Sequence, residues 1–116
     1  MGLFDLFVTV EKEYTQISHS ELQKVVEEKA EGTVSIIDVR TSGEYENGNI
    51  QGALNMNVTA TNFIHQLEGL DKNAIHYIIC ASGNRSRLAC GIMKKKGFKH
   101  AVNVDGGMMA WQGSEE

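Results

Sequence analysis

The residues with the clearest chemical potential begin at Cys80, the first residue of the segment CASGNRS. Cys80 ends an apolar run that predicts a buried strand, and Ser86 begins a stretch that predicts a helix. The five residues between them are too few to form an extended loop, so they must wrap tightly over the cysteine. Gly83 can adopt the positive φ that such a turn requires. Successive backbone N–H groups would then converge on the sulfur, with the positive end of a helix behind them.

These surroundings predict a reactive thiolate. Helix N-termini and nearby cations lower the pKa of a cysteine from about 8.5 to roughly 3.5–7.5. Ligand sites of open α/β sheets form beyond the carboxyl ends of strands, and Cys80 is predicted at such an end. We therefore expect Cys80 to be the nucleophile, and the same N–H groups to hold a persulfide or an incoming oxyanion.

The other candidate side chains carry less chemistry. Cys90 is expected at a semi-exposed position of the following helix, with a resolving role as the less favoured alternative. Two cysteines and four scattered histidines make neither a disulfide framework nor a metal site, so we expect no metal and no cofactor. His76 is too distant to be a base for Cys80, because four residues of strand span about 13 Å.

Two helices are the best defined of the elements that must position this loop. Ser18 and Glu21 form a capping box, with Ile17 and Leu22 at the staple positions, which predicts a helix over 18–29. The second covers 86–96 and is expected to present its apolar face to the core. That face is expected to comprise Leu88, Ala89, Ile92 and Met93.

Short apolar or β-branched runs predict the strands, and a weaker helix is expected over 62–67. Strands alternating with helices of these lengths predict an α/β fold with a mainly parallel central sheet. The strands are expected at 34–39, 53–56, 76–80 and 101–104.

Length and charge bound the remaining possibilities. The 116 residues suit one domain, predicted as an appendage over 1–13 and a single domain over 14–116. No apolar stretch is long enough to span a bilayer and no secretory signal is present, so we expect a cytoplasmic protein without membrane contact.

The net charge is -4, yet residues 72–104 hold seven basic residues and no acid. This excess is small and lacks interleaved aromatic residues, which argues against nucleic-acid binding.

The segment CASGNRS resembles the active-site loop of rhodanese-like domains, whose pattern is close to Cys-x-x-Gly-x-Arg-Ser. Three further segments resemble the family's other signatures in the same order. They are Asp38-Val39-Arg40 with Glu44-Tyr45, then Gly48-Asn49-Ile50-Gln51-Gly52-Ala53, and finally Gly106-Gly107 with Trp111. The resemblance spans roughly residues 17–111. Three positions depart from the family's usual residues, namely Asn49, Gln51 and Asn57.

The resemblance implies a three-layer rhodanese-like fold with about five strands flanked by helices. It also implies a sulfurtransferase that takes sulfane sulfur from a small anionic donor such as thiosulfate. Cys80 would carry the sulfur as a persulfide and pass it to cyanide, a thiol or a protein. By position, the backbone of Ala81, Ser82, Gly83, Asn84, Arg85 and Ser86 would cradle the transferred sulfur, with Arg85 facing anionic groups.

Several alternatives stay open. The chain fits a sulfur-relay or regulatory module without turnover. A cysteine phosphatase or arsenate reductase is less favoured, because those enzymes use Cys-x5-Arg and here the arginine comes one residue early, at Arg85. Arg85 has the alternative of pairing with an acid such as Glu44 or Asp38. Asp38 and Arg40 are expected to form a structural ion pair more than a catalytic one, and Trp111 to be a packing residue.

Overall fold

The structure is a computed structural model of the 116-residue chain, and it describes residues 15–29 and 33–111. The predicted appendage over 1–13 lies outside the described residues. No helix in the described ranges is long and apolar enough to cross a membrane.

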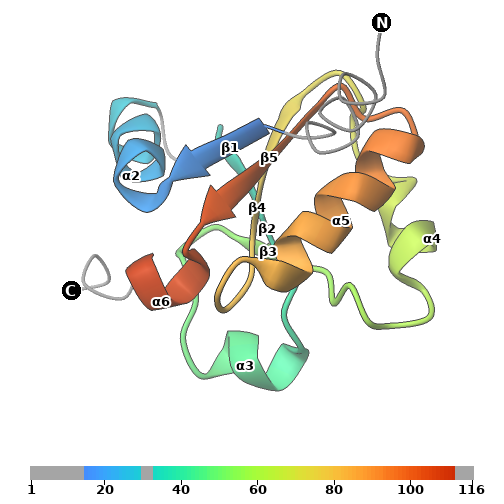
Figure 1. Cartoon of the computed structure of the whole chain (residues 1–116), viewed down its shortest axis with the longest axis horizontal. Coiled ribbons are helices and arrows are strands. Elements are labelled where there is room, and N and C mark those ends of the chain that lie inside the picture. The colour runs from blue at the N-terminus through green and yellow to red at the C-terminus, as the bar shows by residue number, and fades with distance from the viewer. Residues whose placement is uncertain (1–14, 30–32, 112–116) are drawn as a thin grey trace, which may run out of the picture.

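A five-stranded sheet forms the centre of the molecule, with the strand order β1-β5-β4-β2-β3 (Figure 1). Every neighbouring pair of strands is parallel, which confirms the α/β class and the mainly parallel sheet. The sequence missed β1, because its four residues TQIS carry a single apolar side chain and lie at a sheet edge. The strands are β1 (Thr15–Ser18), β2 (Ser35–Asp38), β3 (Leu54–Asn55), β4 (Ile75–Ile79) and β5 (His100–Asp105).

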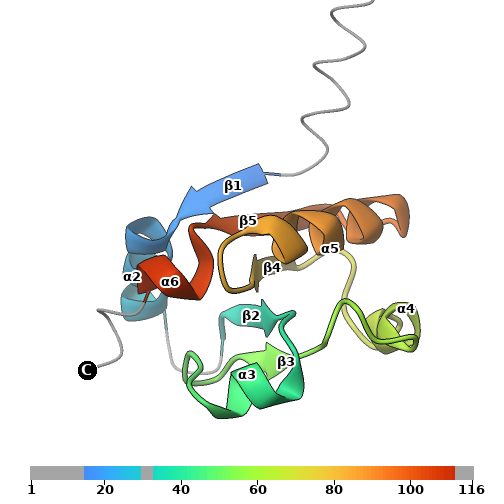
Figure 2. The ribbon, with the colours of Figure 1, turned by 60° about the horizontal axis from the view of Figure 1, so that its bottom comes forward.

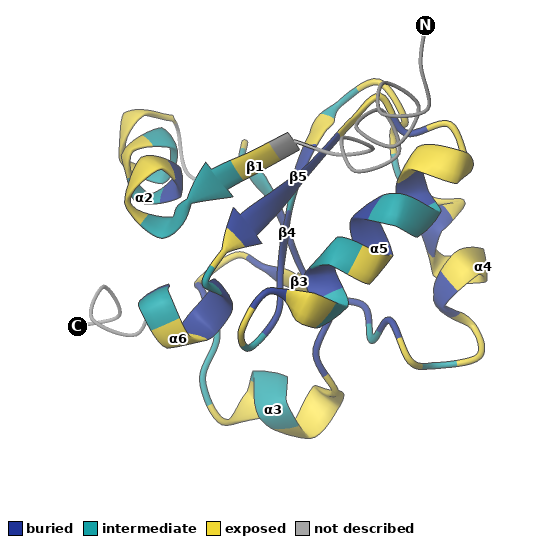
Figure 3. Ribbon diagram, viewed as in Figure 1, coloured by how far each residue is buried: buried dark blue, intermediate teal, exposed yellow. Residues whose placement is uncertain are grey.

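Helices cover both faces of the sheet and give three layers (Figure 2). The side chains of neighbouring residues in a strand point to opposite faces of the sheet, so one strand contributes side chains to two hydrophobic cores. In β4, Ile78 packs with the apolar residues of α4 and α5, whereas Ile79 packs with those of α2 and α6. The central strands are accordingly buried along most of their length (Figure 3). The helices are α2 (His19–Glu28), α3 (Ser42–Glu46), α4 (Phe63–Leu67), α5 (Asn84–Lys95) and α6 (Gly107–Trp111).

The start of α2 confirms the predicted capping box. The Ser18 hydroxyl accepts from the Glu21 N–H at 3.1 Å, and the Glu21 carboxylate accepts from the Ser18 N–H at 3.0 Å. Leu22 is fully buried and Ile17 packs against the same cluster, as the staple positions predicted.

The apolar face of α5 differs from the predicted one. Leu88 is 55% exposed, and Cys90, expected to be semi-exposed, is fully buried beside Ala89 and Met93. The reason lies at the start of the helix, where Ser86 is turned inward with no exposed surface. A helix that buries residue 86 also buries residues three, four and seven positions later, which leaves Leu88 in solvent.

Three chain connections meet at the carboxyl edge of the sheet. The chain passes from β2 into α3, from β4 through a short loop into α5, and from β5 into α6. Because β4 lies between β5 and β2, the loop that follows it has α6 on one side and α3 on the other (Figure 1). The candidate site lies in this loop.

Candidate active site

Cys80 directly follows β4 and is fully buried. The loop above it rises through Ala81, which is half-buried, to Ser82, which is exposed, and returns inward at the buried Gly83. Helix α5 then begins at Asn84, two residues before the predicted start. The structure thus brings the predicted loop residues into one tight turn over the sulfur.

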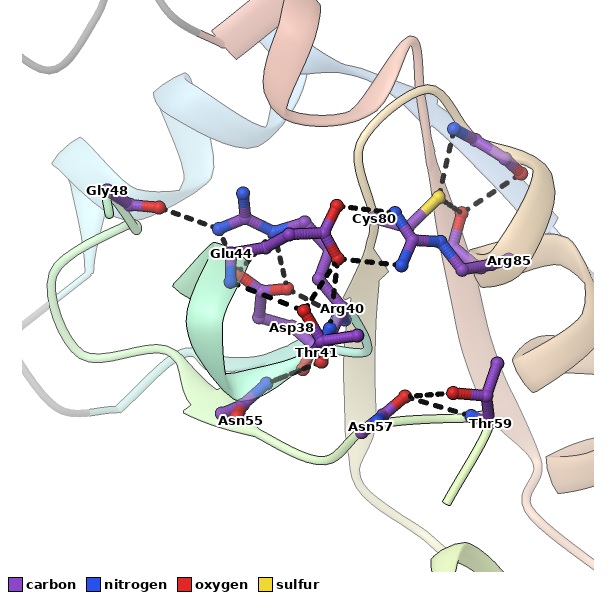
Figure 4. Close-up of polar contacts among 12 residues, drawn as sticks. Asp38, Arg40, Thr41, Glu44, Gly48, Asn55, Asn57, Thr59, Cys80 and Arg85 are labelled. Atoms are coloured by element: carbon purple, nitrogen blue, oxygen red, sulfur yellow. Dashed lines mark hydrogen bonds and ion pairs between the residues drawn. The ribbon is translucent and has the colours of Figure 1, made fainter. Parts of the chain in front are cut away.

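Backbone N–H groups point at the sulfur of Cys80, as the sequence predicted. The Gly83 N–H donates to Cys80 Sγ at 3.0 Å, and Ser86 Oγ lies 3.4 Å from the same atom (Figure 4). Gly83 has φ +109°, a conformation that favours glycine, and it caps α5 without offering a side chain. The Ser86 N–H, in the first turn of α5, also donates to the sulfur, which therefore takes the place that a capping oxygen occupies at other helix starts.

The surroundings of Cys80 lower its pKa in spite of its burial. Burial has the largest effect on the pKa and raises it. Hydrogen bonds with the Ser86 side chain and from the backbone N–H groups of Ser86, Gly83 and Ser82 oppose this, and together they bring the pKa below the ordinary value for cysteine. The site consequently favours a thiolate.

Helix α6 holds the other side of the loop by its backbone. The Met108 N–H donates to the Cys80 carbonyl at 2.7 Å, and the Met109 N–H donates to the Ala81 carbonyl at 3.0 Å. With these carbonyls held outward, the N–H groups that follow are free to face the sulfur. Such a close approach requires glycine at position 107, where a Cβ would lie 2.3 Å from the Cys80 carbonyl oxygen.

Arg85 pairs with an acid, which was the alternative left open by the sequence. Its two terminal nitrogens donate to the Glu44 carboxylate at 2.8 and 2.9 Å (Figure 4). Glu44 belongs to α3, whose capping box with Thr41 fixes it in place. The Arg85 guanidinium and the Thr41 N–H lower the pKa of Glu44 to about 2. The ion pair ties the start of α5 to α3, and it occupies the guanidinium that was expected to face anions.

Asp38 and Arg40 form the predicted ion pair beneath α3. Arg40 Nη2 donates to Asp38 Oδ2 at 2.7 Å and to the Gly48 carbonyl at 2.6 Å, and both side chains are buried (Figure 4). Asn55 adds hydrogen bonds from its side-chain amide to the carbonyls of both residues. These contacts join β2, β3 and the segment after α3, which is a structural role.

Two of the departures from the family pattern are also explained by local hydrogen bonds. Asn57 accepts from the Thr59 N–H at 2.9 Å and from the Thr59 hydroxyl at 2.7 Å, which fixes the turn at this position (Figure 4). Asn49 donates to the Tyr45 carbonyl at 2.8 Å.

Neither Cys90 nor the buried His76 is placed to take part in the chemistry of Cys80. Burial and the nearby charge of Cys80 raise the pKa of Cys90 to about 12, so this thiol stays protonated at neutral pH. His76 is buried at the amino-terminal half of β4, where Ser35 Oγ and the Asp71 carbonyl hold its ring nitrogens. Among residues 15–29 and 33–111, no group of three or more acids, cysteines and histidines has a geometry that could hold a metal ion.

Sequence reasoning missed Asn103, which lies in β5 with no exposed surface. Its Oδ1 accepts from the Ser86 hydroxyl, and its Nδ2 donates to Gln16 Oε1 at 2.9 Å. The signal was present, because Asn103 is the single polar residue in the predicted strand AVNV. Trp111, by contrast, is buried in the core beside α2, as expected for a packing residue.

Comparison with known proteins finds one family. The model of the rhodanese-like domain matches residues 18–114. A Bacillus subtilis protein named "Putative sulfurtransferase YtwF" is 38% identical over 101 residues, which cover 87% of this chain and 93% of that protein. The thiosulfate sulfurtransferase GlpE of Shewanella oneidensis is 28% identical over 97 residues, or 84% of this chain and 94% of GlpE.

Two further similarities extend this result. A second Bacillus subtilis protein, named "Putative sulfur carrier protein YrkF", is 39% identical over 84 residues. These residues cover 72% of this chain, and the chain spans 44% of that protein's length. The crystal structure of a rhodanese-like domain protein from Staphylococcus aureus superposes with a TM-score of 0.75 at 36% identity, over 84% of this chain and 90% of that one.

Proposed function

This chain belongs to the rhodanese-like domain family, and on that premise we propose that it is a sulfurtransferase that carries sulfane sulfur as a persulfide on Cys80. The observation that carries the proposal is the position of Cys80 Sγ under the Gly83 N–H, at the start of α5. A sulfur held by backbone donors is stabilised as an anion, both as the thiolate and as the terminal sulfur of a persulfide.

The proposed donor is thiosulfate or a similar small anion, as the name of GlpE suggests for that relative. The Cys80 thiolate attacks the sulfane sulfur, a new S–S bond forms, and the S–S bond of thiosulfate breaks. Sulfite leaves with the electron pair of the broken bond. The N–H groups of Ser82, Gly83 and Ser86 then face the new terminal sulfur, which carries the negative charge.

The second half of the proposed reaction returns the enzyme to its starting state. A nucleophile such as cyanide, a thiolate or a protein thiolate attacks the terminal sulfur of the persulfide. The bond between the two sulfur atoms breaks, and its electron pair returns to Cys80 as thiolate. Both steps use protein groups and the two substrates alone, so the proposal includes no metal and no cofactor.

A sulfur carrier that serves a protein acceptor is the second candidate function, because YrkF bears that description. The phosphatase alternative finds no support in the loop. A phosphatase requires an arginine that grips the oxyanion, whereas Arg85 is engaged by Glu44. We also propose that residues 14–116 act as one domain in the cytoplasm, where reducing conditions keep Cys80 free.

Steady-state kinetics distinguish the enzyme from the carrier. The wild type and Cys80→Ser are assayed for thiocyanate formed from thiosulfate and cyanide, and in parallel for sulfur passed to a thiol. We expect turnover in the wild type and none in Cys80→Ser. Negligible turnover with every small acceptor, together with stoichiometric loading of the wild type with sulfur, would favour the sulfur-carrier function over the enzymatic one.

A further inference from the structure

A chain of four polar side chains leads from the edge of the sheet to the thiol. Gln16 of β1 is exposed, whereas Asn103, Ser86 and Cys80 have no exposed surface. Asn103 Nδ2 donates to Gln16 Oε1 at 2.9 Å, and the Ser86 hydroxyl donates to Asn103 Oδ1. Cys80 Sγ lies 3.4 Å from Ser86 Oγ, close enough for the thiol to donate to that oxygen.

The Ser86 hydroxyl has one proton and three neighbouring acceptors. Besides Asn103 Oδ1 it lies 3.1 Å from the Gly83 carbonyl and 3.4 Å from Cys80 Sγ. When the proton points to Asn103, the Ser86 oxygen can only accept from Cys80, which stabilises the neutral thiol. When the proton points to the sulfur, the hydroxyl stabilises the thiolate.

The orientation of the Asn103 amide decides between these two states. With Oδ1 toward Ser86, as observed, the amide attracts the hydroxyl proton away from the sulfur. A half-turn of the amide would present Nδ2 to Ser86 Oγ, and the hydroxyl proton would then be free to point at the thiolate. The hydrogen bond to Gln16 Oε1 favours the observed orientation of the amide, because that oxygen can accept from Nδ2 and cannot donate to Oδ1.

We propose that Asn103 is a positioning residue that controls, through the Ser86 hydroxyl, whether Cys80 is held as a thiol or as a thiolate. The inference rests on the proposed function, since it gives that function a means of setting the reactivity of its nucleophile. Asn103 restrains ionisation in the resting protein, and Gln16 sets the strength of the restraint.

The test is a titration of Cys80 by ultraviolet thiolate absorbance, in a Cys90→Ala background so that one thiol is observed. Asn103→Val removes the acceptor and suits a strand, and we expect it to lower the pKa of Cys80 by about one unit. Ser86→Ala should raise the pKa, because the thiolate then loses a hydroxyl that can turn toward it, and a hydrogen bond to the charged sulfur is stronger than the one that the neutral thiol donates. The double variant should titrate like Ser86→Ala alone, because Asn103 acts only through the hydroxyl.

Two further variants keep the test decisive. Gln16→Ala changes an exposed, uncharged side chain, so the protein should fold, and we expect a smaller fall in the pKa that vanishes in the Ser86→Ala background. Asn55→Val removes a comparable amide from β3, and it should lower stability and leave the pKa of Cys80 unchanged.

The proposal is overturned if Asn103→Val and Gln16→Ala leave the pKa unchanged or raise it. It is equally overturned if they lower it as much without the Ser86 hydroxyl, or if Asn55→Val gives the same shift. The titration uses no sulfur donor. A failure of Cys80 to load sulfur would therefore refute the proposed function and leave this result standing on its own.

Discussion

Replacing Gly107 with alanine places a methyl group where the active-site loop now lies. The new Cβ would be 2.3 Å from the Cys80 carbonyl oxygen and 2.7 Å from the Ala81 carbonyl oxygen. Both neighbours are backbone atoms, so neither can turn aside as a flexible side chain would. The first turn of α6 must move away from the loop, and the hydrogen bonds from the Met108 and Met109 N–H groups are lost.

The magnitude follows from two contributions. Gly107 has φ +57°, and a side chain in that conformation costs roughly 1–2 kcal/mol. A buried carbonyl left without its donor costs about 1–3 kcal/mol. We therefore expect the free energy of unfolding to fall by roughly 2–5 kcal/mol. The pKa of Cys80 should rise as the N–H groups of the loop drift from the sulfur.

Urea denaturation with two matched controls separates these contributions. Gly52 has φ +87° and open space around its Cα, so Gly52→Ala reports the conformational cost alone. Gly43 lies in α3 with nothing near a new Cβ, so Gly43→Ala should be close to neutral. If Gly107→Ala were no less stable than Gly52→Ala and kept the wild-type pKa of Cys80, α6 would not be what holds the loop.

Three other variants test the surroundings of the thiol. Glu44→Gln should cost about 1 kcal/mol at neutral pH, since the pair with Arg85 is about one-third exposed. The folded-state pKa of Glu44, about 2, lies below the unfolded value of about 4.3, so this contribution is present above pH ~4.3 and disappears toward pH 2. Denaturation at several pH values should show the wild type and the variant converging in acid, and a constant difference would contradict the pairing. Arg85→Ala should lower the thermal midpoint and leave the KM for thiosulfate nearly unchanged. A large rise in KM would show instead that Arg85 contacts the sulfur donor. Cys90→Ala should cost about 1 kcal/mol and keep sulfur loading, and a loss of loading would reveal a resolving role.

The sequence predicts well where the backbone follows from local chemistry. The capping box at Ser18 and Glu21 located α2, and the tight link after Cys80 located the turn of N–H groups, because each depends on residues close together in the chain. Thr41 and Glu44 carry the same signal for α3, which was not among the predicted helices.

Contacts between distant elements could not be read from the sequence in the same way. The buried side of α5 depends on Ser86 meeting Asn103 of β5, which turns Cys90 inward and Leu88 outward. The pairing of Arg85 with Glu44 joins residues 41 positions apart, and the sequence offered more than one acid for it. The buried face of α5 and the partner of Arg85 are both determined by the packing of the sheet, which brings the ends of β2, β4 and β5 to one edge.

The central claim is that Cys80 carries the transferred sulfur, and intact mass spectrometry tests it most directly. The wild type and Cys80→Ser are incubated with thiosulfate, and the excess thiosulfate is removed. Their intact masses are then measured before and after cyanide is added. We predict that the wild type gains the mass of one sulfur atom and returns to its original mass with cyanide, while Cys80→Ser stays unchanged. Loading of a folded Cys80→Ser, or a wild type that takes up no sulfur from thiosulfate or any other sulfane donor, would contradict the account.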